Sequence, residues 1–172
     1  MLACVDVAYL QNFARVACVL FRDFEDAEPK SILVVKSELA APYVPGELYR
    51  RELPPILDVL SRVHERLEMV VVDGYVWLGP HGPGLGARLY ESLDRAVPII
   101  GVAKTSWAES KDEEDPARCA IEVFRGNSKR PLFVTAVGVD VSLAASWISS
   151  MHGEHRLPTL LKRVDAASRG EP

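Results

Sequence analysis

The stretch Met-Val-Val-Val-Asp at residues 69–73, followed by Gly74, constrains the fold of this chain more than any other. Such a run of apolar, mostly β-branched residues predicts a strand that is buried on both faces of a sheet. A second run of this kind lies at residues 97–102 and closes at Ala103 and Lys104. Between the two runs lie Leu85 and Leu89, which have the spacing of one face of a helix. Buried strands that alternate with helices predict a parallel α/β unit.

Three further strands are predicted ahead of this unit, at residues 2–8, 16–21 and 32–35, and their short links favour an antiparallel meander. A helix from about residue 50 carries its apolar stripe at Ile56, Leu60, Val63 and Leu67. Residues 121–124 and 132–137 predict a hairpin, and helices are expected at 143–151 and 157–167. The predicted fold is a single α/β domain over residues 1–172, a mixed sheet of an antiparallel triplet plus parallel strands with helices on both faces.

Composition excludes few functions. A hydrophobic content of 48% in 172 residues is enough for one core, and the net charge of −4 does not exclude a nucleic-acid partner, because a local basic patch is enough for binding. The three cysteines form no C-x-x-C pair, so neither a disulfide framework nor a zinc site is predicted. The apolar N-terminal stretch lacks a basic region, and no run of roughly 18 apolar residues occurs, so a cytoplasmic protein without a membrane span is expected.

Two carboxylates are candidates for an active site at one edge of the predicted sheet. Asp6 is in the middle of the first strand, where a charge costs several kcal/mol to desolvate unless it is paired or binds a metal. Its alternative is an exposed position on an edge strand. Asp73 ends a buried strand, and its alternative, which is favoured when this stretch is taken alone, is an ordinary Asp-Gly turn. If the two strands are neighbours, the carboxylates converge, and Mg²⁺ suits such a pair.

Four other residues are candidates for the same site. Glu52 lies on the apolar stripe of its helix, and Asp165 lies on the last helix, where the alternative is a solvent-facing aspartate. Lys104 follows a buried strand and is a candidate phosphate contact or a solvated lysine. His81 is in a Gly/Pro-rich loop, where a single histidine is usually a surface residue.

Several segments, taken in chain order, resemble the endonuclease V family. They are VDVAY, PYVPGELYRRE, VVVDG, a loop with His81, PIIGVAK and RLPTLLKRVD, and they extend over nearly the whole chain. PYVPG followed by the glutamate and the GVAK box are specific signals, whereas VDG alone is weak. The resemblance implies a ribonuclease H-like fold and cleavage of nucleic acid near deaminated adenine.

The resemblance also implies a role for individual residues. Asp6 and Asp73 would ligate Mg²⁺, with Mn²⁺ as the alternative, and Glu52 would complete the metal site. Asp165 falls where relatives carry a histidine or an aspartate, Lys104 matches a lysine that contacts phosphate, and His81 is the equivalent of the loop histidine. The residues implied in substrate binding are Pro42, Tyr43, Val44, Pro45, Gly46, Leu48 and Gly74. Tyr43 falls in the wedge that is inserted beside the lesion.

The implied activity is a Mg²⁺-dependent hydrolysis at the second phosphodiester bond 3′ of hypoxanthine, leaving a 5′-phosphate. The substrate would be DNA containing deoxyinosine, with inosine-containing RNA left open, and the protein would be a monomer acting in repair. Two family boxes differ here: His-Pro-Arg-Arg is replaced by His81-Gly82-Pro83-Gly84, and Gly-His-Arg/Lys is replaced by Gly138-Val139-Asp140.

These losses of positive charge favour a rival reading, a non-catalytic nucleic-acid binder. The acidic set argues against that rival, because four carboxylates repel phosphate in the absence of a metal. A phosphoesterase of small substrates is a third reading, in which the PYVPG loop has no evident role.

Overall fold

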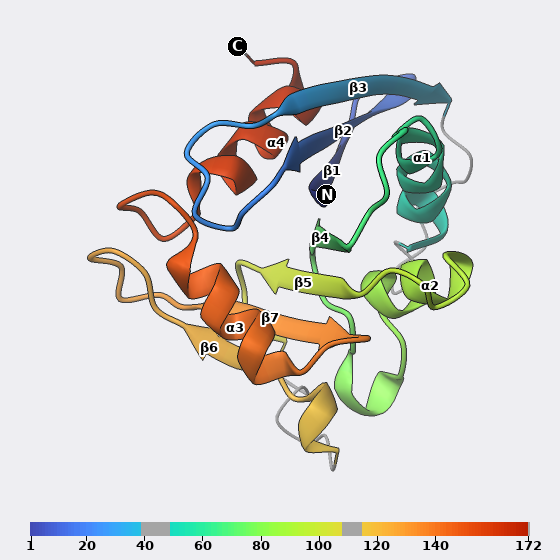
Figure 1. Ribbon diagram of the computed structural model, residues 1–172. Helices are drawn as coiled ribbons and strands as arrows, with labels where there is room; N and C mark the ends of the chain where they lie inside the picture. The colour runs from blue at the N-terminus through green and yellow to red at the C-terminus, as the bar shows by residue number, and fades with distance from the viewer. Residues whose placement is uncertain (39–48, 108–114, 172) are drawn as a thin grey trace.

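The strands of the computed structural model form one mixed sheet in the order β3-β2-β1-β4-β5-β7-β6 (Figure 1). The structure describes residues 1–38, 49–107 and 115–171. The strands are β1 (Leu2–Tyr9), β2 (Phe13–Phe21), β3 (Ser31–Glu38), β4 (Met69–Asp73), β5 (Ile99–Ala103), β6 (Ile121–Val123) and β7 (Leu132–Val137). The helices are α1 (Tyr49–Ser61), α2 (Leu85–Ser92), α3 (Val141–Ser150) and α4 (Thr159–Arg169), with short 3-10 helices at Gly79–His81 and Pro116–Arg118.

The strand directions confirm the predicted topology. Strands β1, β2 and β3 form an antiparallel meander, and β4 and β5 add to it in parallel beside β1. Strand β7 is antiparallel to β5 and forms a hairpin with β6. The carboxyl ends of β1 and β4 therefore meet at one edge of the sheet.

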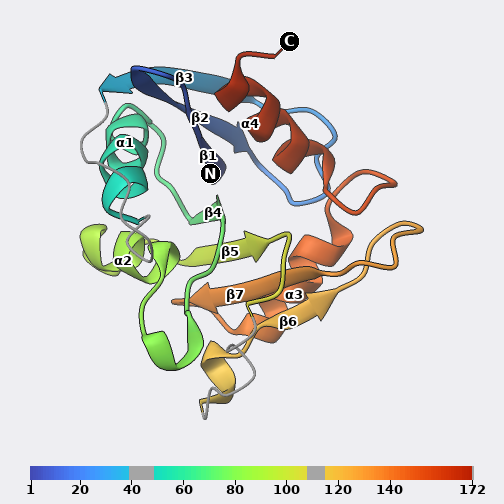
Figure 2. The same cartoon turned by 180° about the vertical axis from the view of Figure 1, so that it is seen from behind.

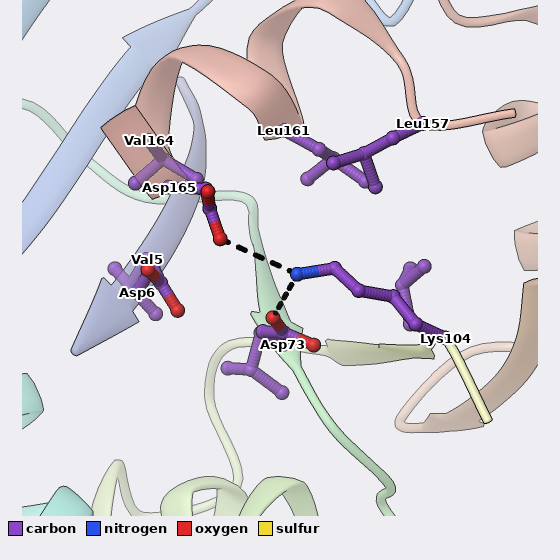
Figure 3. Close-up of a pocket in the computed structure, with 10 residues that line it drawn as sticks. Val5, Asp6, Asp73, Lys104, Leu157, Leu161, Val164 and Asp165 are labelled. Carbon is purple, nitrogen blue, oxygen red and sulfur yellow. Dashed lines mark hydrogen bonds and ion pairs between the residues drawn. The ribbon is translucent and has the colours of Figure 1, made fainter. Parts of the chain in front are cut away.

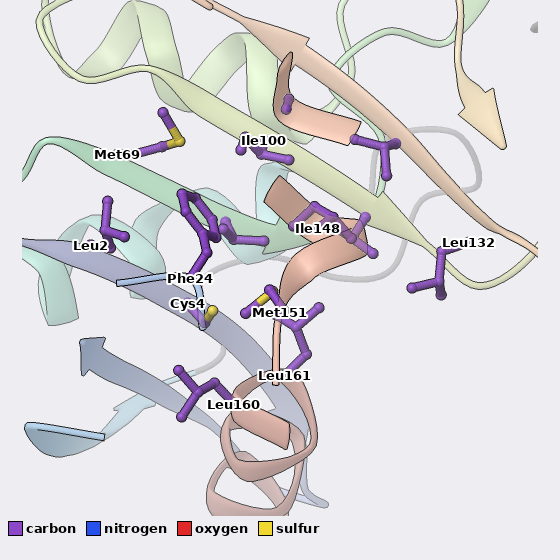
Figure 4. Close-up of a cluster of buried hydrophobic side chains, with 14 of the residues drawn as sticks. Leu2, Cys4, Phe24, Met69, Ile100, Leu132, Ile148, Met151, Leu160 and Leu161 are labelled. Atoms are coloured by element: carbon purple, nitrogen blue, oxygen red, sulfur yellow. The ribbon is translucent and has the colours of Figure 1, made fainter. Parts of the chain in front are cut away.

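Helices cover both faces of the sheet, as predicted, with α1 and α2 on one face and α3 and α4 on the other (Figures 1 and 2). The alternation of side chains along β1 shows why. Ala3 and Val5 pack in the cluster under α1 and α2, whereas Cys4 packs in the cluster under α3 and α4 (Figure 4). Each face is apolar, so the sheet requires a helical layer on either side.

The main local difference from the prediction is the end of α1. The helix ends at Ser61, so Val63 and Leu67 lie in an irregular segment beyond it. Both are still partly buried against the cluster under α1 and α2. The apolar stripe continues past Ser61 because the residues beyond the helix are buried as well. The spacing of apolar residues alone does not distinguish a buried helix from a buried irregular segment. Within the described residues, no helix is long and apolar enough to span a membrane.

Candidate active site

Asp6 and Asp73 come from neighbouring parallel strands. The ladder between β1 and β4 ends at the pair Val5 and Val72, and the two aspartates are the next residue on each strand. They follow the parity of Cys4 and Val71, so both side chains belong to the face that α4 covers. Because β1 has β2 on one side and β4 on the other, the reading of Asp6 as a residue of an edge strand is wrong.

Lys104 follows β5 on the same face and links two carboxylates (Figure 3). Its Nζ lies 2.7 Å from Oδ2 of Asp73 and 3.4 Å from Oδ1 of Asp165. Burial lowers the pKa of Lys104, but the hydrogen bond to Asp73 and the charges of Asp73 and Asp165 outweigh burial and raise it. Asp165 is 26% exposed and faces this lysine, so the alternative of a solvent-facing aspartate is wrong.

Helix α4 contributes two residues that the sequence analysis missed. Oγ of Ser168, which is fully buried, lies 2.6 Å from Oδ2 of Asp6 and 2.8 Å from the backbone carbonyl of Asp165. A hydroxyl has one proton, and the shorter contact to a charged acceptor favours donation to Asp6. Arg169 donates to Oδ1 of Asp165 at 3.1 Å. The helical spacing of Ser168 from Asp165 was the signal that could have revealed it.

Glu52 approaches from α1, on the opposite face, and lines a cleft together with Asp6 and Asp73. Burial, then the charges of Asp6 and Asp73, raise the pKa of Glu52 to about 8, against the opposing effect of Arg51. Burial also raises the pKa of Asp6, with smaller contributions from Asp73 and Asp165, although the Ser168 hydrogen bond and Lys104 lower it. Asp6 and Glu52 therefore hold a proton more tightly than isolated carboxyl groups do, because each is buried beside other carboxylates.

The carboxylates have the chemistry of a Mg²⁺ site, but their side chains are not gathered around one point. A wider cleft is lined by all four of them together with Lys104 and Arg169. Within residues 1–38, 49–107 and 115–171, no three carboxylate, histidine or cysteine side chains lie close enough to hold one cation as they stand. Oδ2 of Asp73 is bonded to Lys104 instead. The donor set fits Mg²⁺ by its hard oxygen atoms.

A sequence profile of endonuclease V matches residues 1–166. The chain belongs to the endonuclease V family. An endonuclease V from Rhodospirillum centenum is 31% identical over 160 residues, which cover 83% of this chain and 66% of that relative. Another, from Pyrococcus horikoshii, is 33% identical over 168 residues, covering 98% of this chain and 72% of the relative.

Solved endonuclease V structures share the fold, which is ribonuclease H-like as predicted. The endonuclease V from Streptomyces avermitilis has a TM-score of 0.75 at 26% identity, covering 98% of this chain and 79% of its own. The endonuclease V from Ciona intestinalis, in complex with a 24mer DNA containing an inosine followed by a ribo-adenosine, has a TM-score of 0.81 at 19% identity. That comparison covers 98% of this chain and 84% of the other.

Gly74 and His81, two residues predicted for the endonuclease V site, differ in where they lie relative to the carboxylates. Gly74 has a φ of +135°, which residues with a side chain rarely adopt. Its N–H donates to the carbonyl of Val102 at 3.1 Å. It thus turns the chain directly after Asp73. The ring of His81 meets the ring of Trp107 edge-on at a centroid distance of 6.2 Å, and His81 does not line the clefts that hold the carboxylates.

The structure explains one departure from the endonuclease V pattern. Asp140 caps α3, its carboxylate accepting hydrogen bonds from the backbone N–H of Ser142 at 2.9 Å and of Leu143 at 3.0 Å. The segment that replaces the Gly-His-Arg/Lys box thus begins a helix. The predicted wedge and pocket residues Pro42, Tyr43, Val44, Pro45, Gly46 and Leu48 lie outside the described residues.

A stacked pair beside Glu52 was also missed by the sequence analysis. The guanidinium of Arg51 lies 4.2 Å from the ring centroid of Tyr9. The hydroxyl of Tyr9 and Nε of Arg51 are buried, and neither has a hydrogen-bond partner among the residues that the structure describes. Tyr9 lines the wide cleft together with Asp6 and Glu52, and Arg51 directly precedes Glu52 in the chain. The pair supplies a positive charge and a phenol beside the acidic cluster.

Proposed function

We propose that this chain is a metal-dependent endonuclease that hydrolyses a phosphodiester bond on the 3′ side of hypoxanthine in DNA, as a step in repair. One observation carries the proposal: in a chain of the endonuclease V family, Asp6, Glu52, Asp73 and Asp165 surround one cleft, with Lys104 between them. The Ciona relative, which is bound to DNA containing an inosine, supports the substrate class.

Asp6, Asp73 and Glu52 would hold Mg²⁺, or Mn²⁺ in its place, through carboxylate oxygens. When bound there, the cation supplies Lewis-acid polarisation of a phosphate and a more acidic water. Glu52 would contribute as a carboxylate once it has lost the proton that burial and its neighbours favour. Asp73 and Lys104 are 39% and 38% exposed, so both side chains are accessible to a ligand from solvent.

Lys104 would contact the phosphate. Its ammonium keeps its charge at neutral pH, because the hydrogen bond to Asp73 raises its pKa. A shift of Nζ from the two carboxylates to a phosphate oxygen would leave Asp73 for the cation and stabilise charge that develops on the phosphate. The expected products are a 3′-hydroxyl and a 5′-phosphate.

The test uses the purified chain and a labelled single strand of DNA with one inosine. The expected result is a single cut 3′ of the inosine with Mg²⁺, and none with EDTA, with Asp73→Ala, or on the same strand with adenosine. An inosine-containing RNA strand, run in parallel, decides between DNA, RNA and both. Cutting of the adenosine strand at the same rate, or full activity of Asp73→Ala, would contradict the proposal.

A second candidate is a nucleic-acid-binding relative with little or no turnover. It is favoured by the ion pairs of Lys104 and Arg169, which satisfy Asp73 and Asp165 without a metal ion. Asp73→Asn separates the two candidates. An enzyme loses turnover in this variant, whereas a binder has none to lose and binds the strand as well or more tightly, because a charge that repels phosphate is gone.

A further inference from the structure

Three side chains of the β-meander form a group that the proposed chemistry does not use. They are Phe13, Arg15 and Lys36, and we call them the cation-aromatic strip. Nζ of Lys36 lies 4.0 Å from the ring centroid of Phe13, and the guanidinium carbon of Arg15 lies 6.0 Å from it. Phe13 and Lys36 also line a surface hollow with Asn12, Ser37 and Glu38. The group presents two cations beside one ring.

The strip lies on the same face of the sheet as the acidic cluster. Asp6 pairs with Ala17 of β2, and Arg15 and Phe13 precede Ala17 by two and four residues, so all point to that face. Lys36 pairs with Arg15 across to β3. Four residues of a strand separate the level of Asp6 from Phe13, which is about 13 Å.

The strip connects to the active site through the end of α4. A Cβ on Gly170 would collide with a terminal nitrogen of Arg15, so this guanidinium rests against the residue that ends the helix. The preceding residue, Arg169, donates to Asp165 in the cleft. Arg169 adjoins Gly170, which Arg15 approaches, and Arg15 pairs with Lys36 across the β2–β3 ladder, so three basic residues follow one another from the cleft to the strip.

The two cations of the strip keep their full charge. Within the described residues, neither Arg15 nor Lys36 has an ion pair, whereas Lys30, Arg62 and Arg95 are each paired with a glutamate or an aspartate. A neutral ring orients a cation without neutralising it. The positive charge of the strip is thus available to an anion of a bound ligand.

We propose that the cation-aromatic strip binds the sugar-phosphate backbone of the strand that is being cut. The separation of about 13 Å corresponds to roughly four stacked nucleotides between the strip and the scissile phosphate. The inference rests on the proposed function, which supplies the strand. The backbone is the favoured occupant because the strip offers charges and no arrangement that reads a base edge.

Binding is tested with a labelled single strand of about 20 nucleotides that carries adenosine and is not cut, with anisotropy read over salt concentrations from about 50 to 200 mM. The double variant Arg15→Gln/Lys36→Gln is expected to bind at least about fivefold more weakly, and its slope of log K against log salt should fall by about 0.7 for each cation removed. Lys129→Gln, between β6 and β7 at the other edge of the sheet, is the matched control and should change neither value.

Two further variants give results that a general loss of folding would not. Glu38→Gln removes a carboxylate from the same hollow and is expected to tighten binding. Phe13→Leu keeps both charges and loses the ring that orients them, so affinity should fall while the salt slope stays. An unchanged salt slope in the double variant, or weaker binding by Glu38→Gln, would overturn the proposal.

Cleavage of inosine strands that are shortened one nucleotide at a time from either end locates the contact. The parent should lose kcat/KM when one of the ends becomes too short to reach the strip, and the double variant should lose that dependence on length. If kcat/KM depended on strand length equally in the parent and in the double variant, the proposed role of the strip would be refuted. Failure of the parent to cut any inosine strand would refute the proposed function, while the binding experiment would still decide on the strip.

Discussion

Ser168 donates a hydrogen bond of 2.6 Å to Oδ2 of Asp6, and the two residues are 162 positions apart in the chain. The bond joins the first strand to the last helix at the acidic cluster. Because Ser168 is fully buried, water does not replace this donor when it is lost. The orientation and the pKa of Asp6 therefore depend on a residue without charge.

Ser168→Ala should raise the pKa of Asp6, because the hydrogen bond from Ser168 lowers it. The acid limb of the pH-rate profile should then move to higher pH, and the free energy of unfolding should fall by about 1–2 kcal/mol. Ser146→Ala is the control, since Oγ of Ser146 bonds the carbonyl of Leu143 at 2.7 Å on an exposed part of α3. A profile that does not move would mean that Ser168 supports only the fold.

Lys104→Gln should have opposite effects on cation binding and on turnover. The ammonium competes for Asp73, so its removal should tighten Mg²⁺ binding by about tenfold. Turnover should fall by about 100-fold, because the contact to phosphate is lost. Calorimetric titration with Mg²⁺ and cleavage kinetics measure the two effects. Lys30→Gln, which removes an exposed ion pair with Glu65, should alter neither, and weaker Mg²⁺ binding by Lys104→Gln would contradict the assigned role.

Glu52→Gln should change how stability depends on pH. In the folded chain the pKa of Glu52 is raised to about 8, against 4.5 for the ordinary group, so the folded state holds a proton that the unfolded state has released between these values. The free energy of unfolding of the parent should therefore fall as pH rises from 4.5 to about 8. The loss should be roughly 1–3 kcal/mol.

Glu52→Gln should lack this loss, and Mg²⁺ should restore the stability of the parent at pH 8 but not that of the variant. Denaturant unfolding at several pH values measures the effect. Glu122→Gln, exposed on β6, is the control and should follow the parent. If the parent gains stability over this pH range through Glu52, the raised pKa is wrong.

Arg156→Lys tests a positioning residue. The guanidinium of Arg156 donates to the backbone carbonyls of Lys104 and Pro131 and so holds the residue that carries the active-site ammonium. A lysine does not reach both acceptors in one plane. We expect kcat to fall by about tenfold with little change in KM.

Arg125→Lys is the comparison for this prediction. Arg125 donates to the carbonyl of Ser149 at the end of α3 and to three carbonyls of the segment between α3 and α4, and none of these acceptors lines the cleft. This variant should lose stability while kcat per folded molecule is kept. A loss of kcat in Arg125→Lys that matches that of Arg156→Lys would show that both act only through the fold.

The strands and the acidic residues were predictable because each leaves a local signal. Strands β4 and β5 are buried on both faces and therefore read as continuous apolar runs, as at Val70 and Ile100. Asp73 stood out as the charge that ends such a run. The end of α1 was not predictable, because Val63 and Leu67 are buried against the same cluster from outside the helix.

The partners of the site residues left weaker signals, and the helical spacing of Ser168 from Asp165 was the clearest of them. Ser168 is an ordinary serine in a helix, and Phe13, Arg15 and Lys36 are ordinary members of two strands. Their contacts depend on the register of β1, β2 and β3 and on where α4 ends above them. A shift of one residue in either ladder would turn the strip to the other face.

The sequence by itself determined the order of strands and helices, the family, and which carboxylates belong to the candidate site, because burial and chemistry select residue types locally. Tertiary structure alone decided that Asp6 and Asp73 lie on adjacent strands, that Lys104 is held between Asp73 and Asp165, and that Ser168 reaches Asp6. The physical reason is that these contacts join segments far apart in the chain, and their geometry depends on strand register and helix packing, which no local pattern of residues encodes.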